Sequence, residues 1–122
     1  MKQENCVFCK IINKEIPSTP VFEDDDLIVI NDRDPKAPVH MLIMPKKHIV
    51  NLDALTEEDF VIVSKILMTA QRLAKEKDIL GRYKVVTNVG EIAGQTVMHM
   101  HFHVLGGWNS NSEVTTQLKQ QL

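Results

Sequence analysis

Short runs of apolar residues, separated by turn residues, dominate the chain, and each run predicts one strand. They cover residues 21–23, 27–31, 40–45, 83–88 and 98–105. Short apolar runs bounded by Asp, Asn, Gly or Pro are typical of β-strands. The three aspartates at 24–26 are expected to form the turn between the first two strands. Residues 32–38 contain two prolines and residues 90–94 contain two glycines, so both segments are expected to be loops.

Two segments carry apolar residues at helical spacing. The first covers residues 6–14, with apolar side chains at positions 7, 8, 11 and 12, and is expected to end near Pro17. The second is longer and runs from Thr56 to Asp78. Thr56 is a good N-cap, and acidic residues fill the next three positions, where the helix dipole favours negative charge. The face expected to pack on the sheet consists of Phe60, Val63, Leu67, Ala70 and Ala74.

Strands on both sides of one long helix, joined mostly by short connections, predict an α+β domain with an antiparallel sheet. The expected sheet has five strands, accompanied by one long and one short helix. The 122 residues suit a single domain with one core. A composition of 43% hydrophobic and 25% charged residues is typical of a packed chain and not of a disordered one.

Composition and charge narrow the function classes. The net charge of −2 gives no overall attraction to nucleic acid, although a local basic patch stays open. The apolar runs are all shorter than the roughly 18 residues that a membrane span needs. The first 14 residues lack the hydrophobic stretch of a signal peptide. We therefore expect a cytoplasmic protein that binds neither nucleic acid nor membranes.

Three of the five histidines stand at alternate positions near the end of the chain: His99, His101 and His103. In one strand they would share a face at about 7 Å spacing, while the residues between them face the core. Imidazole changes protonation near neutral pH, and its neutral nitrogen can attack phosphorus to form a covalent intermediate. The row therefore indicates a nucleophile flanked by positioning or metal-binding partners. A solvated strand face, or simple metal capture, is the alternative.

The segment before this row contains residues suited to holding phosphate. Backbone N–H groups of a loop containing Gly94, together with the Thr96 hydroxyl, can bind phosphate oxygens as charge develops. The alternatives are a turn glycine at Gly94 and a strand-end cap at Asn88.

The sequence Cys6-x-x-Cys9 supplies half of a tetrahedral metal site. In a reducing compartment such a pair is more often metal-binding or redox-active than a structural disulfide. A structural zinc would need two further protein ligands. No thioredoxin-like βαβ pattern surrounds the pair, which disfavours a redox role. Two free thiols in a short helix are the remaining alternative.

The stretch HMHFHVL at residues 99–105 resembles the signature of the histidine-triad (HIT) family of nucleotide hydrolases and transferases, in which three histidines alternate with apolar residues. Further stretches resemble its Hint-type branch: FCKII (8–12), EIP (15–17), FED (22–24), APVH (37–40), IMPKKHI (43–49) and GQTVMHMHFHVLGG (94–107). The resemblance implies a HIT-like fold, with a HIT domain over residues 1–107. The tail over residues 108–122 matches no pattern of the family.

The resemblance also implies roles for individual residues. His101 would attack the α-phosphate of a nucleotide to form a nucleotidyl-histidine, which water then hydrolyses. His103 would contact the phosphate, and His40 would lie near the triad. The substrate-binding positions that it implies are Asp32 for the ribose, Asn88, Gly94, Gln95, Thr96 and Val97 around the phosphate, and Phe8, Ile11, Ile30 and Leu42 around the base. Thr96 stands where serine is common, and the hydroxyl is kept.

Zinc-bearing members of the family imply a ligand set of Cys6, Cys9, His48 and His99. Such a structural zinc would tie the N-terminal helix to the catalytic strand without contacting phosphate. The resemblance further implies a two-fold homodimer with sheets that continue across the interface. The activity expected first is cleavage of the P–N bond in purine nucleoside 5′-phosphoramidates, releasing AMP from adenosine substrates. The alternatives are hydrolysis of dinucleoside polyphosphates, nucleotidyl transfer, and regulatory nucleotide binding with incidental catalysis.

Overall fold

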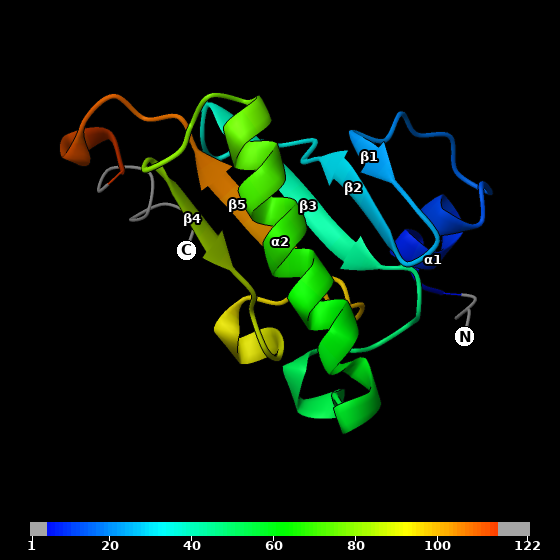
Figure 1. Cartoon of the computed structure of the whole chain (residues 1–122). Coiled ribbons are helices and arrows are strands. Elements are labelled where there is room, and N and C mark those ends of the chain that lie inside the picture. The colour runs from blue at the N-terminus through cyan, green and yellow to red at the C-terminus, as the bar shows by residue number, and fades with distance from the viewer. Residues whose placement is uncertain (1–4, 115–122) are drawn as a thin grey trace.

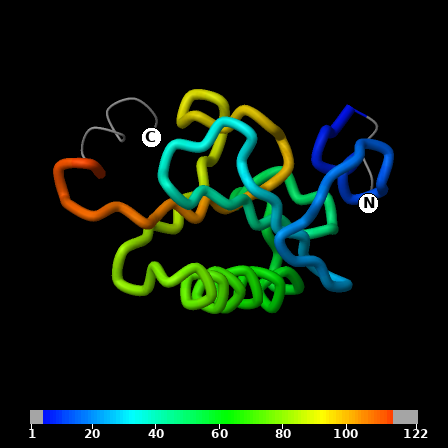
Figure 2. The backbone as a smooth tube through the Cα atoms, turned by 90° about the horizontal axis from the view of Figure 1, so that it is seen from above, coloured from blue at the N-terminus to red at the C-terminus, as the bar shows by residue number. Residues whose placement is uncertain are grey.

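A computed structural model describes residues 5–114 of the chain (Figures 1 and 2). Its helices and strands follow in the order α1 (Val7–Ile12), β1 (Phe22–Glu23), β2 (Leu27–Asn31), β3 (Val39–Pro45), α2 (Phe60–Glu76), β4 (Tyr83–Val86) and β5 (Phe102–Gly106). Three 3₁₀ turns lie between them: η1 (Leu52–Ala54), η2 (Glu57–Asp59) and η3 (Glu91–Ala93). None of the helices among the described residues has the length and apolar character needed to cross a membrane.

The strands form one antiparallel sheet in the order β1-β2-β3-β5-β4. This confirms the predicted α+β fold with a five-stranded antiparallel sheet. Figure 2 shows the long helix α2 on one side of the sheet, with the loops before β3 and before β5 on the other side. The helix therefore covers one face and leaves the other face for a site.

Strands β2 and β3 are buried on both faces of the sheet. Leu27 and Val29 belong to the core beneath α2, whereas Ile28 belongs to a second cluster with residues of α1. Because successive side chains of a strand point to opposite faces, the two strands supply both clusters. This two-sided burial explains why β3 is an almost continuous apolar run.

The face of α2 that packs on the sheet is only partly the one predicted. Ala70 and Ala74 are buried as expected, but Phe60 is 60% exposed and Leu67 is 49% exposed, so the prediction was wrong for these two. The helix has apolar residues on two sides, and successive residues lie about 100° apart around its axis. Tertiary packing selects the side that carries Ile66 and Leu73, together with the partly buried Ile62 and Val63.

The start of this helix is built as a capping turn. The backbone N–H of Thr56 donates to the Asp59 carboxylate at 3.0 Å, so the predicted cap residue does stand at the start. The first turn, however, is the 3₁₀ turn η2, and the α-helix proper begins at Phe60. Such a tightened first turn is frequent at helix ends.

The last strand is shorter than predicted and begins at Phe102 instead of Met98. His99 and His101 therefore precede the strand, and only His103 lies within it. The segment before the strand bonds to other partners: the Met100 N–H donates to the Ile49 carbonyl at 2.6 Å. Strand β4 also ends early, at Val86 instead of Asn88.

The orientation of α2 can be tested with two leucines that differ in burial. We expect Leu73→Ala to lower the free energy of unfolding by about 2–5 kcal/mol, because it removes a buried side chain and leaves a cavity. Leu67→Ala, on the exposed side, should change it by less than about 0.5 kcal/mol. Urea unfolding followed by circular dichroism measures both. Equal losses in the two variants would contradict the assigned face.

Candidate functional site

The histidines gather on the face of the sheet opposite α2. His40 in β3 and His103 in β5 come from adjacent strands, and the ring centroids of His101 and His103 are 5.1 Å apart. His40 and His101 are buried, with 5% and 8% of their surfaces exposed, and His103 is half-buried. The structure thus brings together the three predicted catalytic residues. They come from β3, from β5 and from the segment just before β5.

A main-chain bond selects the tautomer of His101. Its Nδ1 lies 2.7 Å from the carbonyl oxygen of His99. A carbonyl oxygen can only accept, so Nδ1 of the neutral ring carries the proton and Nε2 keeps its lone pair. Burial lowers the pKa of His101, which favours this neutral form. The ring therefore presents an unprotonated nitrogen at neutral pH.

A second chain of bonds selects the opposite arrangement for His103. The Lys36 backbone N–H donates to His40 Nδ1 at 3.0 Å, so the proton of a neutral His40 is on Nε2. That Nε2 lies 2.9 Å from His103 Nδ1 and donates to it. His103 consequently carries its own proton on Nε2. One histidine offers a nucleophilic nitrogen and its neighbour offers an N–H donor.

Burial keeps both members of this pair neutral. It lowers the pKa of His40, and it lowers the pKa of His103 to about 4, with nearby His101 and His40 as smaller causes. Asp32 Oδ2 is 3.4 Å from His40 Nε2 and opposes the shift at His40. The donor atoms of Asp32, His40 and His103 also lie close enough to suggest a metal site. Because His40 Nε2 holds a proton, we interpret this cluster as a hydrogen-bonded network instead.

The loop before β5 is fixed by Gln95. Its side chain is 2% exposed; Oε1 accepts from Asn51 Nδ2 at 3.1 Å and from the Gly90 N–H at 2.8 Å. Its Nε2 donates to the carbonyl oxygens of Val50 at 2.7 Å and Val97 at 3.0 Å. Gln95 was expected to bind substrate, but its side chain is occupied within the protein. It holds the loop in place for its neighbours.

Gly94 and Asn88 lie next to each other in this loop region. A methyl group at Gly94 would meet Asn88 Nδ2 at 3.5 Å, and Gly94 has a φ of +101°, which side chains rarely adopt. The backbone conformation therefore favours glycine here, whereas the contact with Asn88 would be of ordinary van der Waals length. Thr96, which follows the buried Gln95, is exposed.

The predicted base-binding residues form one apolar cluster. Phe8 and Leu42 are buried there, and Ile11, Ile30 and Val97 pack against it while partly exposed. The cluster joins α1 to the sheet face that carries the histidines. Asp32 follows β2 directly and is partly buried, and its carboxylate lies 3.4 Å from His40 Nε2. An apolar surface, a carboxylate and a histidine pair thus adjoin one another.

The residues Cys6, Cys9, His48 and His99 converge from three distant segments. His99 Nδ1 lies 3.4 Å from Cys6 Sγ, 3.5 Å from Cys9 Sγ and 3.2 Å from His48 Nδ1, and Cys9 Sγ lies 3.2 Å from His48 Nδ1. Ligands around a tetrahedral zinc, with zinc–ligand bonds of 2.0–2.3 Å, are separated by about 3.3–3.8 Å. The donor set therefore fits zinc in both chemistry and spacing.

The tautomer of His99 also suits a metal ligand. Its Nε2 lies 2.8 Å from the Pro45 carbonyl oxygen and donates to it, which leaves Nδ1 unprotonated toward the two cysteines. A backbone carbonyl on the second nitrogen is the usual support for a ligating histidine. Burial lowers the pKa of His99 to about 4, so protons do not compete for Nδ1 at neutral pH.

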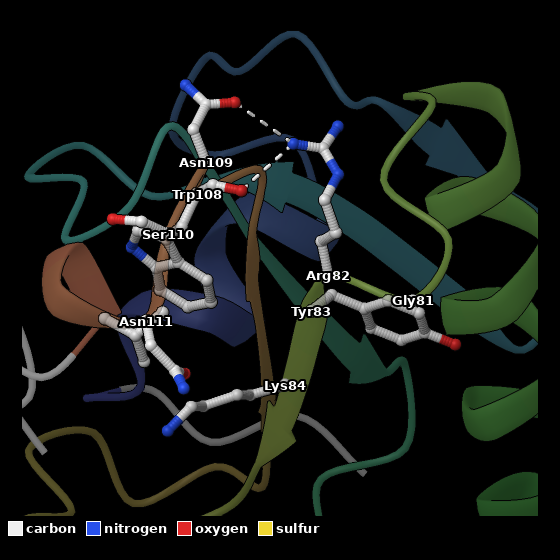
Figure 3. Close-up of a pocket in the computed structure, with 9 residues that line it drawn as sticks. Gly81, Arg82, Tyr83, Lys84, Trp108, Asn109, Ser110 and Asn111 are labelled. Carbon is white, nitrogen blue, oxygen red and sulfur yellow. Dashed lines mark hydrogen bonds between the residues drawn. The ribbon is translucent and has the colours of Figure 1, made fainter.

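A further pocket of about 360 Å³ lies beside the edge strand β4 (Figure 3). It is lined by Gly81–Lys84 and by residues 108–111 and 114. The Arg82 guanidinium donates to the Trp108 carbonyl at 3.0 Å and closes one end. Trp108 itself is buried against Ala37 and Leu105. The first residues after Gly107 are thus packed onto the same body as the histidines.

Together these features define an α+β protein with a buried histidine cluster next to a candidate zinc site. A family profile described as "Scavenger mRNA decapping enzyme C-term binding" matches residues 5–119. A HIT-like protein of Synechocystis is 42% identical over 104 residues, which cover 85% of this chain and 91% of the relative. The chain belongs to the histidine-triad (HIT) family.

Two solved structures extend this comparison. A HIT family hydrolase from Clostridium thermocellum is 46% identical with a TM-score of 0.86, over 90% of this chain and 96% of that one. A zinc-bound histidine-triad protein from Mycobacterium smegmatis is 32% identical with a TM-score of 0.75, over 88% of this chain and 78% of that one. The chain therefore has the fold of these histidine-triad proteins and resembles a HIT family hydrolase over most of its length.

Some residues that shape the site were not found from the sequence. The Lys36 N–H orients His40, and the Thr87 hydroxyl donates to the His101 carbonyl at 2.8 Å. Asn51 supports Gln95 from a different loop. Lys36 acts through its backbone N–H, and the other two become neighbours only in the folded chain, so no pattern marks them.

The low pKa of His103 gives a pH prediction. In nitrogen-15 NMR, its imidazole should titrate with a midpoint of about 4, well below the ordinary value of 6.5. Between these two values the unfolded chain binds a proton at His103 that the folded chain does not. The contribution of His103 to the free energy of unfolding therefore falls as the pH drops from 6.5 to about 4. A midpoint at or above 6.5 would contradict the buried, neutral pair.

Proposed function

We propose that the chain is a Hint-type nucleoside phosphoramidase, which hydrolyses the P–N bond of purine nucleoside 5′-phosphoramidates through a nucleotidyl-histidine. The observation that carries the proposal is the paired tautomers, with a bare Nε2 on His101 and an Nε2–H on neighbouring His103. A neutral nitrogen beside a hydrogen-bond donor suits attack on a phosphate whose oxygens gain charge.

The reaction has two steps. In the first, the Nε2 lone pair of His101 forms a bond to the α-phosphorus while the P–N bond breaks, and the leaving amine takes up a proton from solvent. The developing positive charge on His101 is stabilised by the Nδ1–H bond to the His99 carbonyl. In the second step, water attacks the phosphorus and gives up a proton to solvent, the His101–phosphorus bond breaks, and the nucleoside monophosphate is released. The His103 N–H holds a phosphate oxygen in both steps.

The remaining site residues are proposed to bind the nucleotide. The apolar cluster of Phe8, Ile11, Ile30 and Leu42 would hold the base, and the Asp32 carboxylate would accept the ribose hydroxyls. Asn88, Gly94, Thr96 and Val97 would surround the phosphate. Gln95 remains in this set only as the residue that fixes the loop.

The activity is tested with adenosine 5′-phosphoramidate. We expect the protein to release AMP, and His101→Ala to lower kcat by a factor of about 10⁴ or more, because the nucleophile is lost. Leu67→Ala, on the exposed side of α2, is the control and should retain activity.

Substrate class is decided by running a diadenosine polyphosphate in parallel and by adding acceptor phosphates. Faster turnover of the dinucleotide would replace the proposed substrate, and transfer to an acceptor would make the protein a nucleotidyltransferase. AMP binding without turnover of either substrate would contradict the proposed enzyme and favour a regulatory role.

We also propose that Cys6, Cys9, His48 and His99 hold a structural zinc. Protein purified without chelator should contain one zinc per chain, and Cys9→Ser should lose most of it. The matched control is Ser64→Ala, on the exposed surface of α2, which removes a hydroxyl far from the four ligands. Metal analysis by mass spectrometry decides the question. Wild-type protein with less than about a tenth of one zinc per chain would rule out the site, since structural sites bind tightly.

We further propose a two-fold homodimer in which the sheets continue through β4. The support is that β4 stands at the edge of the sheet with all four residues half-buried, and that Phe60, Val61 and Met68 are exposed on α2. Light scattering after size-exclusion chromatography should give twice the chain mass of 13.9 kDa. A single chain mass at micromolar concentration would refute the dimer.

A further inference from the structure

The chain between β4 and β5 runs outside the sheet, because β4 ends at Val86 and β5 begins at Phe102. Residues 90–95 of this segment form a turn that is closed by its own hydrogen bonds. The Gln95 backbone N–H donates to the Gly90 carbonyl at 3.0 Å, and the Gly90 N–H donates to Gln95 Oε1 at 2.8 Å. This turn and the two residues after it carry most of the groups proposed to surround the phosphate.

The turn is connected to the rest of the protein through a single side chain. Within residues 5–114, each hydrogen bond that joins residues 89–98 to another segment involves the amide of Gln95. Its Nε2 donates to the Val50 carbonyl at 2.7 Å, and its Oε1 accepts from Asn51 Nδ2 at 3.1 Å. The position of the turn therefore depends on the segment that contains Val50 and Asn51.

The partners of the Gln95 amide fix its orientation. Two donors, Asn51 Nδ2–H and the Gly90 N–H, meet its oxygen, whereas the carbonyl oxygens of Val50 and Val97 meet its nitrogen. Three of these four partners are backbone groups, so their donor or acceptor character cannot change. A carboxylate here would face two carbonyl oxygens without a proton to donate. Because Gln95 is buried, such unmatched groups would be costly.

Asn51 uses both ends of its side chain. Its Oδ1 accepts from the Asp53 N–H at 3.0 Å and caps the 3₁₀ turn η1, while its Nδ2 donates to Gln95. The preceding residues 49 and 50 also contact the segment before β5, since the Ile49 carbonyl accepts from the Met100 N–H at 2.6 Å. Residues 49–51 thus support both ends of residues 95–100, and Asn51 is the member that does so with a side chain.

We propose that Asn51 is a positioning residue, which acts through the Gln95 amide to hold the loop of Gly94, Thr96 and Val97 in place for the phosphate. Groups that are placed before the reaction stabilise the charge that develops in the transition state, so their misplacement lowers kcat more than it weakens substrate binding. The kinetic part of this inference rests on the proposed phosphoramidase activity, whereas the structural part does not.

Asn51→Asp tests the bridge, because it removes the donor and keeps an oxygen that can cap η1. The new carboxylate would also repel Gln95 Oε1. With adenosine 5′-phosphoramidate at pH 7, kcat should fall at least about tenfold, while KM should stay within about threefold because the proposed base and ribose residues are unchanged. Gln71→Glu, an exposed amide on α2, is the matched control and should leave both constants unchanged. A wild-type kcat in Asn51→Asp, or a loss confined to KM, would overturn the proposal.

Gln95→Glu is the complementary variant, because it removes both donors of the bridging amide and keeps its acceptors. Its kcat should fall at least as far as that of Asn51→Asp. The double variant should be no slower than the slower single variant, because both substitutions break the same connection. Losses that multiply in the double variant would show two independent effects and would overturn the proposal.

Amide hydrogen exchange followed by NMR measures the connection without turnover. In Asn51→Asp, the N–H groups of Gly90 and Gln95 should exchange at least about tenfold faster than in wild type, because the turn that they close has lost a support. Exchange at Leu73 in α2 and Val104 in β5 should be unchanged, which distinguishes local loosening from global destabilisation. Unchanged exchange in the turn would overturn the proposal. If the turn loosens but wild type shows no turnover, the phosphoramidase assignment fails and the structural part stands.

Discussion

The candidate site depends on the hydrogen bond between the His101 ring and the carbonyl oxygen of His99. This bond is 2.7 Å long and leaves the other ring nitrogen of His101 with its lone pair. The bond from the Lys36 N–H to His40 then places a proton on the far nitrogen of His103 through His40. Burial keeps these rings neutral at pH 7. Without these two backbone contacts, the same histidines would present no defined nucleophile and donor.

The fold makes this arrangement possible by using the two faces of the sheet differently. One face packs on α2 through Leu27, Val29 and other apolar side chains. The opposite face carries the histidines, and the short helix α1 covers part of it with Phe8. Because α1 has only six residues and little core of its own, the cysteines at its start are well placed to anchor it. A metal there would stabilise the cover of the sheet face that carries the histidines.

Much of the architecture could be predicted from the sequence, because short apolar runs and turn residues mark each strand. The face of α2 could not, since Leu67 and Ile66 are equally apolar and only packing distinguishes them. The start of β5 was also missed: alternation predicted one strand through His99, whereas this segment bonds to Ile49 outside the ladder. The resemblance to the family predicted that the histidines and the cysteines would lie close together.

The finer features of the site could not be predicted, because they depend on backbone atoms and on contacts between distant loops. The Lys36 N–H that orients His40 leaves no trace in residue type. Gln95 carries an amide that suits a substrate as well as a loop, and only the fold shows that its partners are Val50, Gly90 and Asn51. Residue identity thus indicated a possible chemistry, and the folded backbone determined which ring nitrogens carry protons.

The proposed mechanism requires that His101 becomes covalently bonded to phosphorus. The most direct test is to mix the protein with adenosine 5′-phosphoramidate, quench within one turnover, and determine the mass of the intact chain and of its peptides. We expect one added adenylyl group on the peptide that contains His101. Turnover without any adduct within that first cycle, or an adduct on another residue, would contradict it.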